Sequence, residues 1–347
     1  MPIALVIAVA AVLCGCKANT AFPFGEHGTQ KGTPALSPTM TSSPSPTATS
    51  VPSPTPTATD TPTPTPTQIP AEMLDDPNAP KLQSKAYIVT DGNGRIVLAK
   101  NAQEQLYPAS TIKMLTALTA IDYKDLKDDL TAKAEQLVLD ADVYKYGGYS
   151  AGAVPGMTYP MREWMHMLLI SSCGDAANVI AGNVGGTIDR FMELMNQKAQ
   201  SLGMTHTHVD NPIGLDTGNG FSNIYTTAED MAKLSYAFYR NTALLEISGK
   251  AEYQVPDCPE MKGETLKSSN AFLSDSSKYH SDLFEVIGGK SGGTKAAGNC
   301  FVAVAKDKDG AVFIISVFGA PYGTFEQRGA MFGEIRDVLE YCFKNKK

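Results

Sequence analysis

The chain has 347 residues, 29 basic and 36 acidic side chains and a net charge of −7 at pH 7. This acidic balance, without a basic stripe or an arginine-rich run, argues against nucleic acid as a partner. The length allows one large domain or two ordinary ones, but the first eighty residues lack the composition of a folded domain.

An apolar run of residues 3–13 opens the chain. It is too short to cross a bilayer, which takes about 20 residues, and it has the length of a signal-peptide core. The run ends in LCGC, which resembles a bacterial lipobox, so we expect residues 1–16 to be a signal peptide and Cys16 to be lipidated. That lipid would anchor the protein to the outer face of the bacterial cytoplasmic membrane.

The usual positive segment before the run is missing, as it would be if the start codon were assigned too late. A secreted or uncleaved N-terminus is the alternative to a lipoprotein. All three interpretations predict that the rest of the chain is exported.

Proline marks the segment that follows. Residues 34–70 hold 11 of the 22 prolines, nearly all interleaved with Thr and Ser. Such a segment has too little apolar surface to offset its chain entropy, and its prolines favour an extended spacer. We therefore expect residues 17–80 to form a disordered stalk and residues 81–347 to form one folded domain.

The folded part predicts a hairpin at residues 85–101, which breaks at Asp91-Gly92-Asn93-Gly94. Apolar periodicity predicts helices from residue 110, at 161–172, at 175–182, at 187–204 and at 226–241. Asp175 is placed to cap the third of these helices, and Thr226 or Thr227 the last. Two strands around Asp309-Gly310 and a helix over 324–345 close the chain. This order predicts an α+β fold, in which an antiparallel sheet is built from N- and C-terminal strands and the middle is mostly helical.

Four cysteines lie in the folded part: Cys173, Cys258, Cys300 and Cys342. They are widely scattered and show no CxxC pair and no metal-ligand spacing. In an exported protein they could pair in three ways. A small buried thiol at each position is the alternative.

The segment 107–115, YPASTIKML, places a serine three residues ahead of a lysine at the start of an apolar-periodic stretch. On a helix, Ser110 and Lys113 would lie on one face. A hydroxyl is a poor nucleophile until a base takes its proton, and a buried lysine can be neutral near pH 7 because desolvation disfavours its charge. The pattern alone is weak, since a serine N-cap followed by a solvated lysine is the simpler explanation.

A second segment, Lys290-Ser291-Gly292, stands at the start of the predicted penultimate strand and is followed by Gly293 and Thr294. Glycines at a strand edge let another backbone approach, so a bound peptide could add alongside. The cation and the hydroxyls could then bind a terminal carboxylate. A glycine-rich turn with an exposed lysine is the alternative.

A third segment, Ser172-Cys173-Gly174, lies at the junction of two predicted helices, where a side chain can point into a cleft. A simple helix break would have the same pattern. All three segments in one chain are much less expected by chance than any one of them.

Together they resemble the serine-type D-Ala-D-Ala carboxypeptidases, the low-molecular-weight penicillin-binding proteins, whose S-x-x-K, S-x-N and K-T/S-G motifs occur in this order. The similarity extends over roughly residues 86–343 and includes LYPASTIKMLTALTAI, VDNPIGLD, TTAEDMAKLSYA and GGKSGGTKAAGNCFVAVAKDKDG. The resemblance implies the fold shared by β-lactamases and DD-peptidases, with residues 81–347 as the catalytic domain. It implies no metal and no cofactor.

The resemblance also implies roles for single residues. Ser110 would be the acylated nucleophile and Lys113 its general base, while Ser172 would relay protons to the leaving D-alanine, with Lys290. The N–H groups of Ser110 and Gly293 would form the oxyanion hole. The substrate-binding set would be Ser291, Gly292, Gly293, Thr294, Cys173, Gly174 and Arg328, with Ser291, Thr294 and Arg328 near the substrate carboxylate.

One position departs from the family pattern. In the ungapped register, Gly174 stands where S-x-N has its asparagine, so an amide that usually contacts the substrate is missing. A shift by one residue would instead compare Ser171-Ser172-Cys173 with the motif. We favour the ungapped register, and either one changes a substrate contact.

The sequence thus predicts a lipid-anchored enzyme that removes the terminal D-alanine from peptidoglycan stem peptides through an acyl-enzyme on Ser110 and is inhibited by β-lactams. The same chemistry serves D,D-endopeptidases and transpeptidases. A β-lactamase would need an extra carboxylate for deacylation, and no obvious glutamate loop supplies one. A non-catalytic wall-binding or penicillin-sensing module is the alternative from another class, supported only by Gly174.

Overall fold

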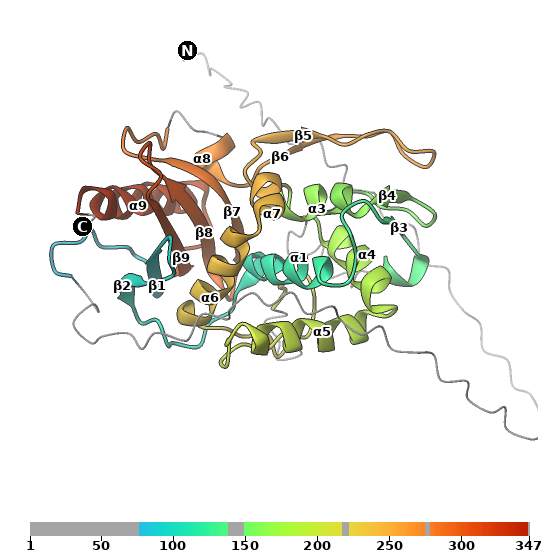
Figure 1. Ribbon diagram of the computed structural model, residues 1–347, viewed down its shortest axis with the longest axis horizontal. Helices are drawn as coiled ribbons and strands as arrows, with labels where there is room; N and C mark the ends of the chain where they lie inside the picture. The colour runs from blue at the N-terminus through green and yellow to red at the C-terminus, as the bar shows by residue number, and fades with distance from the viewer. Residues whose placement is uncertain (1–75, 138–148, 217–221, 275–277, 346–347) are drawn as a thin grey trace, which may run out of the picture. The chain divides into compact units, whose positions relative to one another are not determined.

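The computed structural model describes residues 76–137, 149–216, 222–274 and 278–345 (Figure 1). The predicted signal peptide, Cys16 and all but the last five residues of the predicted stalk lie outside these ranges. None of the helices within them is long and apolar enough to cross a membrane.

A five-stranded antiparallel sheet brings the two ends of the domain together, in the order β2-β1-β9-β8-β7. Its strands are β1 (Ala86–Asp91), β2 (Ile96–Lys100), β7 (Glu285–Thr294), β8 (Gly298–Lys306) and β9 (Val312–Ala320). The β1–β2 turn closes with a hydrogen bond of 3.0 Å from the N–H of Gly94, which has a φ of +80°, to the carbonyl of Asp91. The α+β fold and the shared sheet are therefore confirmed.

Strand β7 was missing from the sequence prediction. We expected Lys290 to Thr294 to begin the penultimate strand, but they end a separate strand that pairs with β8 along its whole length. Four glycines in Glu285–Thr294 give the segment low intrinsic strand propensity, so nothing local marks it. Pairing with β8 makes it a strand, and β7 lies at the edge of the sheet.

Each face of the sheet covers its own core. On one face, β8 and β9 residues such as Phe301 and Ile315 pack with Phe332 and Leu339 of α9 (Phe325–Lys344). On the other face lies the helical region, to the right of the sheet in Figure 1. Its helices are α1 (Lys113–Ile121), α3 (Met161–Leu169), α4 (Gly174–Gly185), α5 (Ile188–Ser201), α6 (Ala228–Arg240) and α7 (Thr242–Ser248).

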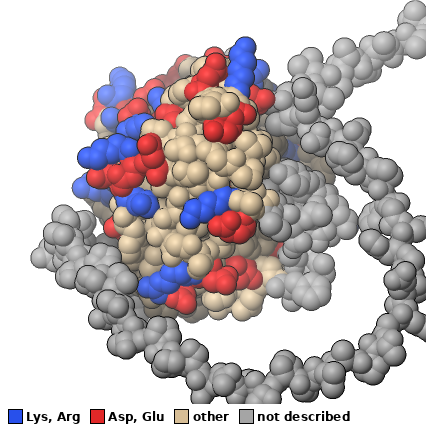
Figure 2. Space-filling view, turned by 90° about the vertical axis from the view of Figure 1, so that its right-hand side faces the viewer, with Lys and Arg blue, Asp and Glu red and all other residues tan. Residues whose placement is uncertain are grey.

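Short elements complete the described parts of the chain. They are the 3-10 helices η2 (Ala109–Ile112) and η3 (Ala134–Gln136), helix α8 (Ala271–Ser274), and the hairpins β3 (Asp129–Thr131) with β4 (Thr158–Pro160) and β5 (Glu252–Gln254) with β6 (Thr265–Lys267). On the face in Figure 2, basic and acidic side chains are interspersed rather than gathered by sign.

The predicted helix signals hold with one exception. Thr227 caps α6 by accepting a hydrogen bond of 3.1 Å from the N–H of Asp230. Asp175, however, is the second residue of α4 and not its N-cap, which is Cys173. The carboxylate of Asp175 instead accepts hydrogen bonds of 2.7–3.0 Å from Ser150, Ala151 and Ala153, and so fixes a neighbouring loop. Among the described residues, Cys258, Cys300 and Cys342 are free thiols.

Candidate active site

The Ser110 hydroxyl and the Lys113 amine lie side by side because the chain is helical between them. Residues 109–112 form the 3-10 turn η2, and α1 begins at Lys113. This places the Nζ atom of Lys113 2.8 Å from the Oγ atom of Ser110. Ser110 lies in the first helical turn but is not its N-cap. The alternative explanation, a serine N-cap followed by a solvated lysine, therefore does not describe this segment.

Lys113 is only 1% exposed, which is unusual for a lysine. Burial lowers its pKa to about 7, although Cys173 and Asp175 nearby partly oppose this shift. Its amine also donates a hydrogen bond of 2.8 Å to the main-chain carbonyl of Ile213. A substantial fraction of the amine is thus neutral near pH 7 and able to accept a proton from Ser110.

The junction of α3 and α4 carries the second segment. Ser172 has a φ of +64° and lines the pocket together with Gly174, whereas Cys173 is 2% exposed and lies behind them. The hydroxyl of Ser171 bonds instead to the carbonyl of Lys267, outside the pocket. This geometry favours the ungapped register, in which Ser172 is the motif serine.

Backbone strain marks two positions at the site. Among the described residues, only Asn101, Ala109 and Ser172 are non-glycine residues with positive φ, and Ala109 directly precedes Ser110. Such conformations cost on the order of 1–3 kcal/mol each and gather at functional sites. The chain therefore holds Ser172 and the residue before Ser110 in conformations that non-glycine residues disfavour.

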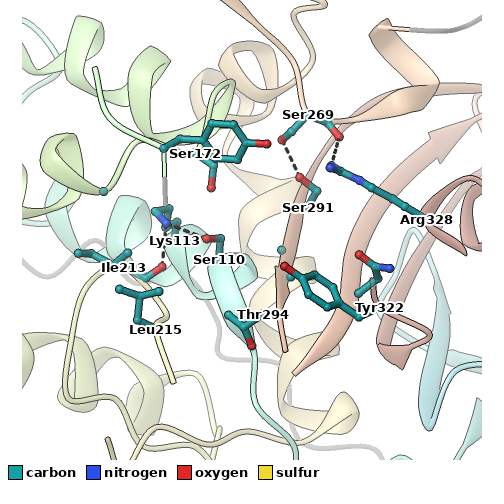
Figure 3. Close-up of a pocket in the computed structure, with 15 residues that line it drawn as sticks. Ser110, Lys113, Ser172, Ile213, Leu215, Ser269, Ser291, Thr294, Tyr322 and Arg328 are labelled. Atoms are coloured by element: carbon teal, nitrogen blue, oxygen red, sulfur yellow. Dashed lines mark hydrogen bonds between the residues drawn. The ribbon is translucent and has the colours of Figure 1, made fainter. Parts of the chain in front are cut away.

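Strand β7 forms the opposite wall of the pocket. The hydroxyls of Ser291 and Ser269 lie 2.6 Å apart, and the guanidinium of Arg328 on α9 donates a hydrogen bond of 2.9 Å to the carbonyl of Ser269. Figure 3 shows this group across the pocket from Ser110 and Lys113. A cation beside two hydroxyls is suited to bind a carboxylate.

Two glycines let β7 approach its neighbours at the pocket, Gly292 the nucleophile segment and Gly293 the ring of Tyr322. A Cβ atom on Gly292 would lie 2.8 Å from the backbone nitrogen of Ser110, and one on Gly293 would lie 3.1 Å from the ring of Tyr322. Lys290 is 1% exposed, and its amine donates a hydrogen bond of 2.8 Å to the carbonyl of Ser291. Burial, together with the positive charges of Lys113 and Arg328, holds the pKa of Lys290 well below its usual value.

Thr294 has a partner that the sequence did not suggest. Its Oγ1 atom lies 2.5 Å from a carboxylate oxygen of Asp216 and accepts a hydrogen bond of 2.9 Å from the N–H of Ala297. Alternate residues of a strand point to opposite faces, and Thr294 accordingly lies on the other face of β7 from Ser291. We expected both hydroxyls to bind the same carboxylate, but the geometry groups only Ser291 with Arg328.

The structure brings residues of all three segments to one pocket. The predicted residues that line it are Ser110, Lys113, Ser172, Gly174, Ser291, Gly292, Gly293, Thr294 and Arg328, while Lys290 and Cys173 lie buried outside its lining. The prediction missed Tyr149, Ile213, Leu215, Ser269, Asn299 and Tyr322. Ile213 and Leu215 fall in the family-like segment VDNPIGLD, which was a usable signal; Ser269 had none.

Comparison with known proteins identifies the family. A family model described as D-alanyl-D-alanine carboxypeptidase matches residues 73–322. The chain belongs to this family. A D-alanyl-D-alanine carboxypeptidase of Mycobacterium tuberculosis (strain ATCC 25618 / H37Rv) is 32% identical over 264 residues, which are 76% of this chain and 82% of that protein. The chain is thus a hydrolase of the serine-peptidase type.

Solved structures agree on the fold. A D-alanyl-D-alanine carboxypeptidase from Mycobacterium tuberculosis H37Rv matches with a TM-score of 0.65 and 27% identity, over 77% of this chain and 93% of that chain. Penicillin-binding protein D2 from Listeria monocytogenes, solved in its ampicillin-bound form, matches with a TM-score of 0.58 and 26% identity, over 76% of this chain and 98% of that chain. The fold is therefore that of penicillin-binding proteins.

Proposed function

We propose that this carboxypeptidase removes the terminal D-alanine from peptidoglycan stem peptides through an acyl-enzyme on Ser110. The observation that carries the proposal is the Ser110–Lys113 pair, with an amine whose pKa lies at about 7 and a distance of 2.8 Å between the reacting atoms. Arg328 and Ser291, across the pocket, would take the terminal carboxylate. This places the scissile bond between the carboxylate site and Ser110.

In the first half-reaction, the hydroxyl oxygen of Ser110 attacks the carbonyl carbon of the penultimate D-alanine and Lys113 takes the hydroxyl proton. The N–H groups of Ser110 and Gly293 stabilise the oxyanion, each contributing a few kcal/mol. The C–N bond then breaks, and the proton passes from Lys113 through Ser172, beside Lys290, to the leaving amine. Free D-alanine departs, and an ester on Ser110 remains.

In the second half-reaction, water attacks the ester carbonyl and the neutral amine of Lys113 takes a proton from the water. The bond to the Ser110 oxygen then breaks, Lys113 returns the proton to that oxygen, and the shortened peptide leaves with a free carboxylate. No step requires a metal or a cofactor. A β-lactam enters the same first step, but opening its ring produces no departing amine. The acyl group then stays on Ser110 and inhibits the enzyme.

The location of the enzyme follows from its substrate. Peptidoglycan stem peptides lie outside the cytoplasm, and the N-terminal sequence has export features. We propose that Cys16 carries a lipid that holds the protein on the outer face of the cytoplasmic membrane. Residues 17–80 would then serve as a stalk that lets the domain of residues 81–347 reach the wall.

Labelling with a fluorescent penicillin tests the function. We expect a stable adduct that maps to Ser110 and that disappears in Ser110→Ala, while the free energy of unfolding changes by less than about 1 kcal/mol. Ser171→Ala is the matched control, because that hydroxyl bonds to Lys267 outside the pocket and its loss should leave labelling intact.

Other outcomes identify the alternatives. Rapid turnover of the label points to a β-lactamase, and a folded wild-type protein without an adduct points to a binding module. Persistent labelling of Ser110→Ala would show that another residue is the nucleophile. Conversion of a pentapeptide into free D-alanine and a tetrapeptide, without a joined product, completes the test, because a transpeptidase would also release D-alanine but would join the shortened peptide to a second one.

A further inference from the structure

The segment of residues 211–216 contacts the reacting groups from the helical side of the pocket. Within it, the carbonyl of Ile213 accepts the hydrogen bond from Lys113, and that of Pro212 accepts one of 2.8 Å from Thr116. Its side chains Ile213 and Leu215 line the pocket. The conformation of this segment therefore decides where an acceptor for the Lys113 amine lies.

Asn211 organises the segment with one side chain. Its Oδ1 atom accepts hydrogen bonds from the N–H groups of Ile213, Gly214 and Leu215, at 3.2, 2.8 and 3.0 Å. Its Nδ2 atom donates to the carbonyl of Leu215 at 3.0 Å and to Asp210 at 2.8 Å. An asparagine that bonds to the backbone two to four residues ahead fixes a tight turn. This turn directs the Ile213 carbonyl toward Lys113.

The turn also packs against the nucleophile segment without spare room. Gly214 has a φ of +87°, and a Cβ atom at this position would lie 2.0 Å from the carbonyl oxygen of Ala109. The turn thus abuts the residue that precedes Ser110. A change in its shape would move the acceptor of Lys113 and the support of Ser110 together.

The chemistry of a neutral amine explains why the acceptor matters. Such an amine has two N–H bonds and one lone pair, and only the lone pair can take the proton of Ser110. When the Ile213 carbonyl accepts one N–H, the amine is restrained in rotation and its lone pair can face the Ser110 oxygen. A carbonyl restrains the amine in this way without adding a negative charge. A negatively charged acceptor would favour the protonated amine. Gly174 has no side chain that could offer a second acceptor.

We propose that Asn211 is a positioning residue, which orients the Lys113 amine for proton transfer by holding the main-chain carbonyl of Ile213 in place. This inference rests on the proposed function, in which Lys113 is the general base. Asn211 does not itself line the pocket. Its effect on the reaction is indirect and passes through one carbonyl oxygen.

The test compares Asn211→Ala with Asn196→Ala. Asn196 is a matched control because it also braces this part of the backbone, bonding through both side-chain atoms to Val209 at 2.8 and 3.0 Å, but it does not contact residues 213–215. The measured quantities are the second-order rate of acylation by a fluorescent penicillin from pH 5 to 10, and the melting temperature. A 13C NMR titration of labelled lysine, assigned with Lys113→Arg, reports the amine without requiring activity.

We expect Asn211→Ala to lower the plateau rate of acylation about 10- to 100-fold, as a misplaced catalytic group does. The pH midpoint at which the rate rises should move to higher pH, because water that reaches Lys113 raises the pKa of its amine. The titratable groups that face Lys113, namely Cys173, Asp175 and Lys290, are the same in both variants, so a difference between them reflects the turn. Asn196→Ala should lose stability but keep the rate within about twofold and the pH midpoint unchanged.

Equal rates and pH midpoints for the two variants at matched folded fractions would overturn the proposal and leave Asn211 a structural residue. If Asn211→Ala does not fold, Asn211→Ser keeps one acceptor and is judged by the same two outcomes. Failure of the proposed function looks different, since it shows in the wild-type protein, which would then form no adduct, turn the label over rapidly or join two peptides. The lysine titration would in that case still show whether Asn211 controls the amine.

Discussion

The hydroxyl of Thr294 lies 2.5 Å from a carboxylate oxygen of Asp216, which is 8% exposed. An ionised carboxylate only accepts hydrogen bonds, so it takes the single hydroxyl proton of Thr294. The Thr294 oxygen then presents only lone pairs to the pocket. Donors toward a substrate carboxylate therefore lie on the Ser291–Arg328 side, and acceptors lie on the Thr294–Asp216 side.

Removal of Asp216 should change the preference of the pocket between a peptide with a charged terminal carboxylate and one with a neutral terminal amide. In Asp216→Ala the proton of Thr294 is free to donate, and a negative charge is gone. We expect the KM for a peptide with a free terminal carboxylate to fall about 2- to 12-fold relative to its C-terminal amide, the value of one ordinary hydrogen bond. The measurement is the ratio of KM values for the two peptides.

Asp216→Asn separates the two effects, because its amide oxygen still accepts the Thr294 proton but carries no charge. Burial raises the pKa of Asp216, so its ionisation at pH 7 destabilises the folded state, and this variant should be at least as stable as the wild type. Equal changes of KM for both peptides in Asp216→Ala would contradict the argument.

The pH dependence of acylation should follow the neutral form of Lys113. Because the pKa of this amine lies at about 7, we expect the rate to rise with pH through 7 and reach a plateau about two units higher. The measurement is the rate of acylation by a penicillin at constant ionic strength. A rate that is flat between pH 5 and 8 would remove Lys113 from the role of base.

Lys113→Met should abolish acylation and stabilise the fold. The pKa of Lys113 is about 7 in the folded protein and near 10.5 in the unfolded chain, so the unfolded state binds more protons between these values. The free energy of unfolding of the wild type therefore rises with pH in this window. The variant lacks this contribution, because methionine does not bind a proton in either state. At pH 7 we expect the melting temperature to rise by about 2–4 °C, and a decrease would contradict the burial argument.

Gly174→Asn should restore the amide that the second motif lacks. A Cβ atom at Gly174 would make only ordinary contacts, the nearest at 3.5 Å with Ile213, so the backbone position accepts a Cβ atom. One new hydrogen bond to the substrate should raise kcat/KM for a D-Ala-D-Ala peptide about 2- to 12-fold. Gly174→Ala is the control for backbone effects, and an equal gain in both variants would rule out the amide as the cause.

Gly214→Ala should cost stability and acylation together, because the new methyl group would meet the carbonyl of Ala109 beside Ser110. Gly310→Ala is the matched control: its φ of +90° is similar, and nothing lies within 4 Å of the added atom. The control should lose only the strain energy, about 1–2 kcal/mol, and keep its acylation rate. Thermal melts and penicillin labelling of both variants measure this, and equal losses would contradict it.

Local patterns were sufficient to predict most elements correctly. Thr227 as a cap, Gly94 in the hairpin turn and the end of α5 near Gly203 depend on contacts between residues close in sequence. Such contacts can be read from spacing because neighbouring residues make them in any tertiary context. Where the local signal was weak, as in the glycines of β7, or ambiguous, as at Asp175, the prediction failed.

The sequence by itself determined the three motifs, the family they resemble and the helices and hairpins that carry them, since each depends on a few consecutive residues. Only the tertiary structure decided that Thr294 pairs with Asp216, that Ser291 groups with Ser269 and Arg328, and that the Ile213 carbonyl holds Lys113. These contacts join residues 22 to 100 positions apart. Their energies arise from burial and geometry that exist only after the sheet and the helical region have packed together.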